Sequence, residues 1–122
     1  MTSTTVGDIN YLFTSEDDNT VHVYKSDGSA YKVILKFDCS GANHLMWLKE
    51  RSILLVSQWN TALGGESVRA FKFSKDFKKK VNEAIVCEAK EGLNIYSWTQ
   101  AGVNGVTLFD GKKRELVDLK II

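Results

Sequence analysis

The chain has 122 residues, the length of one domain, and its 43% hydrophobic and 25% charged residues describe a globular protein rather than a disordered or fibrous one. A net charge of +1 provides no general attraction for polyanions, so we expect no nucleic-acid partner. Apolar runs such as Ile53-Leu54-Leu55-Val56 stop at four residues, which excludes membrane insertion by a helix, and residues 1–10 lack the pattern of a secretory signal. We therefore expect a cytoplasmic protein whose Cys39 and Cys87 are reduced.

The clearest structural signal lies in residues 19–37, "NTVHVYKSDGSAYKVILKF". From Tyr31 to Phe37 every second residue is apolar and lysines dominate the other positions, the pattern of a half-buried strand. Val21–Lys25 forms a similar run, and Ser26–Ser29 between the two supplies an Asp-Gly turn. The stretch is predicted to be a β-hairpin.

Further short strands are expected along the chain, separated by glycine-containing turns such as Ser40–Asn43, Leu63–Glu66, Glu91-Gly92 and Asp110-Gly111. They are Ile9–Thr14, His44–Leu48, Ile53–Ser57, Val68–Phe73, Ala84–Cys87, Leu93–Thr99, Gly105–Phe109 and Glu115–Ile121. This arrangement predicts an all-β fold of short antiparallel strands. Lys75–Ala89 also places apolar residues near helical spacing, so one helix near 75–89 is an alternative.

Three segments share one layout: residues 11–28, 54–76 and 95–113. Each has an apolar strand with a small hydroxyl residue near its end, a polar or glycine-containing turn, and a second strand that ends on an aromatic residue. The equivalent positions 23, 70 and 108 give spacings of 47 and 38 residues. Periods of about 40–45 residues are typical of propeller blades of four strands. In this interpretation Tyr31–Phe37 and Glu115–Ile121 are outer strands of blades, and His44–Leu48 is an inner strand.

Over residues 9–122 the pattern "strand, turn, V-x-V-Y-[KD]-x-x-G, strand" resembles a WD40-type β-propeller segment, although the Trp-Asp and Gly-His pairs of that family are missing. The lysine-rich blades are similar to those of trafficking and intraflagellar transport scaffold propellers. The resemblance implies two to three propeller-like blades, fewer than the four or more that close a ring. Residues 1–122 are thus either a fragment of a larger β-propeller, a unit completed by other copies, or a single all-β domain. The last would be a small closed β-barrel or sandwich with a helix near 75–89.

No residue pattern indicates catalysis, and we expect no cofactor and no metal site. His22 and His44 lack partners at ligand spacing, such as CxxC or HExxH, and are predicted to be surface residues. His44 follows Cys39 by five residues, so a reactive Cys–His pair is conceivable, but such proximity is usually accidental. The glycine pairs at 64–65 and 102–105 match no phosphate-binding motif and are predicted to be turns.

The function expected from these features is that of a non-enzymatic scaffold module, which binds other proteins or copies of itself through rim loops and strand edges. Trp59, Asn60 and Leu63 are predicted to form a partner contact, the alternative being a Trp59 ring folded back onto the sheet. The segment "FKFSKDFKKK" is predicted to bury its phenylalanines and to expose lysines that steer acidic partners: Lys75, Lys78, Lys79 and Lys80. The alternative function is a small β-barrel that binds an apolar ligand among Val33, Leu35, Trp47 and Phe109.

Overall fold

The computed structural model describes residues 1–62, 64–87, 94–103 and 105–120, and these fold into antiparallel β-sheets without a helix. The predicted all-β fold is therefore confirmed. In chain order the strands are β1 (Thr2–Val6), β2 (Ile9–Glu16), β3 (Thr20–Ser26), β4 (Tyr31–Asp38), β5 (Ala42–Leu48), β6 (Ile53–Asn60), β7 (Gly65–Phe73), β8 (Lys80–Cys87), β9 (Ile95–Gln100), β10 (Gly105–Asp110) and β11 (Glu115–Lys120). The predicted turn Glu91-Gly92 and the last residue of the predicted strand Glu115–Ile121 lie outside the described residues.

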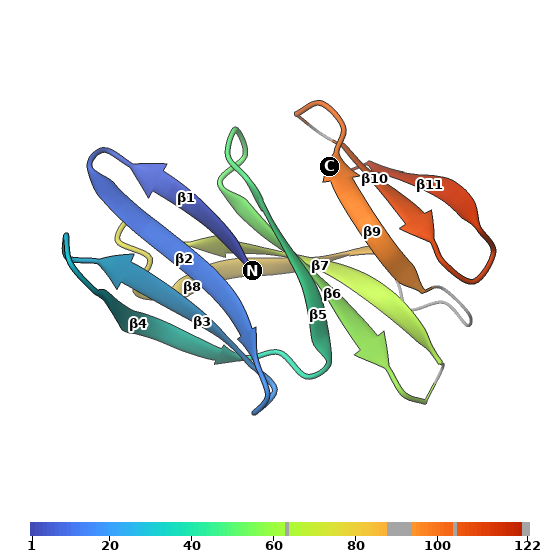
Figure 1. The fold of residues 1–122 in the computed structure, drawn as a ribbon, viewed down its shortest axis with the longest axis horizontal. Helices are drawn as coiled ribbons and strands as arrows, with labels where there is room; N and C mark the ends of the chain where they lie inside the picture. The colour runs from blue at the N-terminus through green and yellow to red at the C-terminus, as the bar shows by residue number, and fades with distance from the viewer. Residues whose placement is uncertain (63, 88–93, 104, 121–122) are drawn as a thin grey trace.

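The strands form three sheets, each a meander in which consecutive strands pair (Figure 1). The first sheet has the order β1-β2-β3-β4, the second β5-β6-β7-β8, and the third β9-β10-β11. The predicted hairpin is β3 with β4: Val23 pairs with Leu35, and the Asp27 carboxylate accepts hydrogen bonds from the backbone N–H groups of Ser29 and Ala30. Because each described sheet is open, with an edge strand on either side, the alternative of one closed barrel is wrong.

The alternative helix near 75–89 is also wrong for the residues that the structure describes. Residues 74–79 form the turn between β7 and β8, and β8 pairs with β7 through Arg69↔Ile85 and Phe71↔Glu83. The apolar spacing that suggested a helix is overridden because β8 satisfies the hydrogen-bonding groups along the edge of β7. Residues 88–89 lie outside the described part of the chain.

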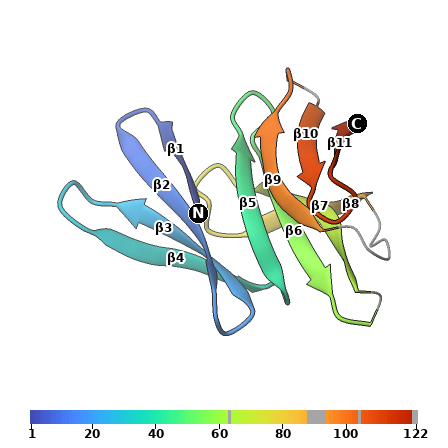
Figure 2. The ribbon, with the colours of Figure 1, turned by 45° about the vertical axis from the view of Figure 1, so that its right-hand side comes forward.

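The three sheets stack face to face, with the second sheet covered on both sides (Figure 2). On β6, Leu54 and Val56 pack against the first sheet, whereas Ile53 and Leu55 pack against the third. This two-sided burial explains why the β6 sequence is a continuous apolar run instead of an alternating one. The core between the first and second sheets contains Tyr11, Phe13, Val21, Val23, Phe37, Cys39, Leu45, Leu54, Val56, Phe71 and Phe77. The core between the second and third contains Leu48, Ile53, Leu55, Val68, Ala70, Ile95, Val106 and Leu108.

The first strands of the three sheets, β1, β5 and β9, run in the same direction along one side of the stack (Figure 1). The backbone N–H of Trp47 on β5 donates to the Thr2 hydroxyl on β1 at 3.3 Å. On the other side of β5, the Trp98 ring of β9 lies 5.9 Å from the His44 ring. The chain thus repeats one unit, a meander sheet, whose first strand stands beside the first strand of the preceding sheet.

This arrangement corrects the register of the predicted repeat in the third sheet. Residues 11–28 and 54–76 hold the central hairpins β2–β3 and β6–β7, as expected. Residues 95–113 instead hold β9 and β10, and β9 lies where β5 does in the second sheet. The equivalent hairpin is therefore β10–β11, and Glu115–Lys120 corresponds to a third strand, although it forms the edge of its described sheet.

Among the described residues no helix has the length and apolarity needed to cross a membrane.

Candidate functional site

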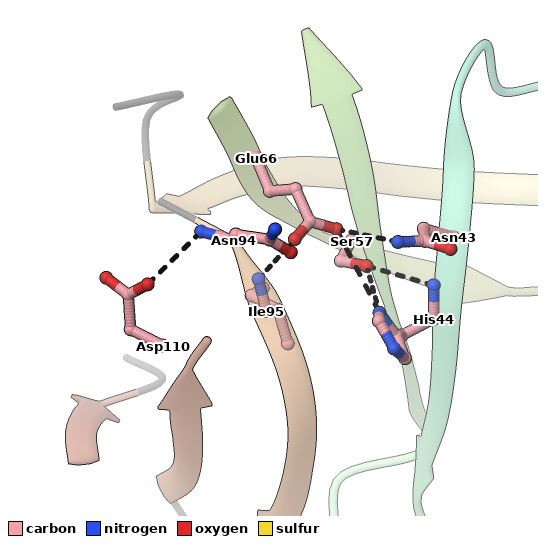
Figure 3. A network of polar contacts seen from close by, with 7 residues as sticks. All are labelled: Asn43, His44, Ser57, Glu66, Asn94, Ile95 and Asp110. Atoms are coloured by element: carbon pink, nitrogen blue, oxygen red, sulfur yellow. Dashed lines mark hydrogen bonds and ion pairs between the residues drawn. The ribbon is translucent and has the colours of Figure 1, made fainter. Parts of the chain in front are cut away.

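The seam between the second and third sheets is closed by a polar network around the Glu66 carboxylate (Figure 3). Glu66, at the start of β7, is 0% exposed. Its carboxylate accepts one hydrogen bond from the Asn43 side chain on β5 at 3.1 Å and another from the backbone N–H of Ile95, the first residue of β9. The ring nitrogen Nδ1 of His44 lies 3.9 Å away. A buried side chain of the second sheet therefore joins β5 and β9.

The same network holds a serine, a histidine and a carboxylate, but not in a catalytic arrangement. The Ser57 hydroxyl lies 3.2 Å from His44 Nδ1, the nitrogen that also faces Glu66. A nucleophile–base relay needs the hydroxyl and the carboxylate on opposite ring nitrogens. Ser57 is also fully buried, and its hydroxyl oxygen accepts the backbone N–H of His44 at 2.9 Å. The cluster is a structural joint between sheets.

A second buried carboxylate closes the turn that was predicted at Asp110-Gly111. Asp110, at the end of β10, accepts hydrogen bonds from the backbone N–H groups of Lys112 at 3.0 Å and of Asn94 at 3.5 Å. Gly111 donates its N–H to the Asn94 carbonyl at 2.7 Å. The turn therefore fixes the segment that enters β9 (Figure 3).

A second feature lies between the first and second sheets. Three turns surround a hollow of about 580 Å³ there, which we call the rim pocket. These are the β1–β2, β5–β6 and β7–β8 turns. The residues lining the rim pocket are Thr4, Thr5, Val6, Gly7, Trp47, Lys49, Ser52, Phe73, Ser74, Lys75 and Phe77. Among the described lining residues, the ionisable side chains are Lys49 and Lys75, and the hydroxyl groups come from two threonines and two serines. The lining thus combines positive charge with an aromatic surface.

The aromatic side of the rim pocket depends on an unusual backbone conformation at Phe77. This residue has φ 58°, which side chains other than glycine adopt at a cost, yet its ring is buried 4.3 Å from the Tyr11 ring and 5.6 Å from that of Trp47. Two hydrogen bonds hold the turn: Phe77 N–H to the Ser74 carbonyl at 2.9 Å, and the Ser74 hydroxyl to the Asp76 carboxylate at 2.7 Å. Burial of the ring offsets the local strain and leaves Lys75 in solvent.

Trp59, predicted to contact a partner, lies at the end of β6 and is 42% exposed. Its backbone is held by Gly41, whose carbonyl accepts the Trp59 N–H at 2.9 Å. With 42% of its surface exposed, the Trp59 side chain is neither free in solvent nor fully folded onto the sheet. Asn60 is the last residue of β6, and Leu63 lies outside the described residues.

The predicted lysines are divided by the structure into two kinds. Lys75, Lys78 and Lys79 are exposed in the β7–β8 turn. Lys80 is half-buried, with its ammonium group 5.0 Å from the centre of the Phe37 ring and 3.5 Å from the Glu83 carboxylate. Trp59 pairs with Glu66 at the start of β7, whereas Lys80 pairs with Phe73 at its end. The two predicted partner regions therefore lie at opposite ends of β7 and do not form one surface.

The conceivable Cys39–His44 pair is not formed. Cys39 is buried in the core between the first and second sheets, while the His44 ring faces the third sheet. Burial raises the pKa of the Cys39 thiol to about 11, so it stays protonated at neutral pH and is a poor nucleophile. His22, predicted to be a surface residue, is half-buried on the outer face of the first sheet, 3.2 Å from the Tyr24 hydroxyl. Among the described residues no histidine, cysteine and carboxylate cluster could hold a metal ion.

The outer face of the third sheet is an apolar surface that the sequence interpretation did not identify. Tyr96 is 75% and Leu116 71% exposed. Phe109 lies between them, paired with Leu116 across the strands and with its ring 6.2 Å from that of Tyr96. We call these three residues the third-sheet end face. At the other end of the stack, Leu12 and Tyr24 pair across β2 and β3 on the outer face of the first sheet.

The residues predicted to line a single apolar cavity are spread over different parts of the molecule. Val33 is exposed on the outer face of the first sheet, and Phe109 belongs to the third-sheet end face. Leu35 and Trp47 pack against the core between the first and second sheets. The structure therefore does not assemble the predicted ligand cavity.

In comparisons with known proteins, no family model, no curated protein and no solved structure matches this chain.

Proposed function

We propose that this chain is a non-enzymatic interaction module, built as a segment of a WD40-type β-propeller, that binds proteins or further copies of itself. Three consecutive meander sheets with aligned first strands support this interpretation, since a propeller is a ring of such sheets. The missing Trp-Asp pairs do not weaken it, because the stacking here is produced by apolar faces and the Glu66 joint. Trafficking scaffolds of the propeller type are the class to which such a segment belongs.

The single observation that carries the proposal is the uncovered third-sheet end face. Every inner face of the stack is covered by the next sheet, and the residues there are buried. On the outer face of the third sheet, in contrast, Tyr96 and Leu116 are more than two-thirds exposed. In repeat architectures a sheet with such a face is stabilised by a neighbour, and an exposed apolar patch marks an interaction surface.

Sedimentation velocity over a dilution series tests this function with two matched charge insertions. Leu116→Glu places a carboxylate in the third-sheet end face, and Val81→Glu places one at an exposed position on β8, away from that face. We expect the wild-type chain and Val81→Glu to self-associate as the concentration rises, and Leu116→Glu to stay monomeric. A wild-type chain that is a stable monomer at every concentration, with Leu116→Glu indistinguishable from it, would contradict the proposal.

A further inference from the structure

The rim pocket is bordered by the free edge of a strand. Four consecutive residues, from Thr4 to Gly7, line it. Side chains of a strand alternate between its two faces, so a pocket on one face would be lined by every second residue. Lining by consecutive residues indicates that the pocket lies beside the edge of the strand. Among the described strands β1 pairs only with β2, and its other edge retains unpaired backbone groups. An edge of this kind is a template for an extended peptide segment.

An apolar surface lies next to that edge. Trp47, Phe73 and Phe77 belong to one aromatic cluster, in which the rings of Phe73 and Phe77 are 5.9 Å apart. On the β1 side Val6 is 51% exposed, although it lines the pocket. An aromatic or large aliphatic side chain placed here would cover Val6 and extend a cluster that is already ordered. The volume of about 580 Å³ is in the range of sites that hold one such side chain with its neighbours.

The charges around the rim pocket are unbalanced. Lys49 and Lys75 are exposed lining residues, and none of the described residues that line the pocket carries a carboxylate. Glu50 and Asp76 follow these lysines in the sequence but are not among the lining residues: Glu50 accepts the Gln100 side-chain amide at 3.2 Å, and Asp76 accepts the Ser74 hydroxyl at 2.7 Å. The described lining of the pocket is therefore positively charged. The buried indole N–H of Trp47 has no hydrogen-bond partner among the described residues.

We propose that the rim pocket binds an extended acidic segment of a partner protein. One aromatic side chain of the segment covers Val6 and the Phe73–Phe77 surface, and carboxylates on either side of it pair with Lys49 and Lys75. The backbone of the segment pairs with the free edge of β1. This inference rests on the proposed function only in taking the ligand to be a protein, and it makes no use of the third-sheet end face.

Fluorescence anisotropy with a fluorescein-labelled peptide, Gly-Asp-Phe-Glu-Glu-Gly, tests the inference. We expect saturable binding to the wild-type chain that weakens as salt is added, and much weaker binding of the uncharged analogue Gly-Asn-Phe-Gln-Gln-Gly. Each of Lys49→Glu and Lys75→Glu should weaken binding by about fivefold, the range of exposed ion pairs. Lys113→Glu, in the exposed β10–β11 turn, is the matched control and should bind like the wild type.

Several results would overturn the inference: no binding at millimolar peptide, equal affinity for the uncharged analogue, or lysine variants that match Lys113→Glu. If free glutamate competes as well as unlabelled peptide does, the ligand is a small acid and the peptide proposal is wrong. The peptide is also titrated into the Leu116→Glu variant. We expect this variant to bind the peptide although it does not self-associate. Peptide binding then tests the rim pocket alone, and sedimentation tests the third-sheet end face alone, so the failure of one proposal is distinguishable from the failure of the other.

Discussion

The carboxylate of Glu66 accepts a hydrogen bond from the backbone N–H of Ile95, so a buried side chain of β7 holds the first residue of β9. The third sheet is thus attached to the second through polar contacts as well as through its apolar core. This joint determines whether the third-sheet end face is presented on a rigid body.

Glu66→Ala should destabilise the protein by about 1–3 kcal/mol, because it leaves the buried Ile95 N–H without its acceptor. Glu66→Gln keeps one acceptor oxygen and should cost less. Urea unfolding measures both. Glu115→Ala, at an exposed position of β11, is the control and should change stability by less than about 0.5 kcal/mol. Glu66→Ala with the stability of that control would show that the joint contributes nothing.

Phe77→Ala should cost about 3–5 kcal/mol, since it removes a buried ring from the cluster that joins the first and second sheets. Phe77→Leu refills part of the space and should cost less than half as much. Thermal unfolding of both variants provides the comparison. A loss below about 1 kcal/mol for Phe77→Ala would mean that the ring does not stay in the core in solution.

Gly41→Ala should be more destabilising than Gly7→Ala, although the two glycines have similar φ values of 71° and 61°. Both variants impose the left-handed backbone on alanine, at about 1–2 kcal/mol. At Gly41 the new methyl group would also lie 2.6 Å from the Trp59 carbonyl oxygen, whereas nothing lies within 4 Å of it at Gly7. Chemical denaturation gives the difference, and equal losses for the two variants would contradict the close approach of Gly41 to β6.

The Cys39 thiol should make stability depend on pH under alkaline conditions. Its pKa rises from 9.0 to about 11 on folding because burial disfavours the thiolate. The unfolded chain therefore loses this proton first, so the stabilising contribution is complete below pH 9 and is lost as the pH rises toward 11. Unfolding curves of the wild type and Cys39→Val between pH 8 and 11 isolate this contribution, because all other groups titrate in both. Parallel pH profiles would show that the thiol is not buried.

The alternation of apolar residues was sufficient to predict β3 and β4, because one face of this hairpin is buried and the other is not. The apolar spacing was less informative for β8, because the sequence allowed both a strand and a helix there. Pairing with β7 makes this segment a strand. The third copy of the repeat was placed one strand too early in the chain. Its matching residues, Leu108 and Phe109, lie on a second strand here rather than on a third.

The candidate sites depend on contacts that no local pattern contains. Lys75 was predicted to meet acidic partners, but its neighbour in the rim pocket, Lys49, comes from a turn that is distant in sequence. Tyr96 follows the buried Ile95, and Leu116 precedes the half-buried Val117, so in the sequence both look like part of a core strand. Their exposure in the structure, 75% and 71%, is what identifies them as a surface. Glu66 looked like a turn residue because its partners, Asn43 and Ile95, are brought to it by the stacking of the sheets.

Amide hydrogen exchange at two protein concentrations tests the third-sheet end face most directly. If this face binds a second copy, the amides of β11 should exchange more slowly in the concentrated sample, while those of β6 should be unchanged because β6 is already buried. The same experiment on Leu116→Glu should show no effect of concentration. Exchange of β11 in the wild-type chain that is independent of concentration, and equal to that in Leu116→Glu, would contradict the account.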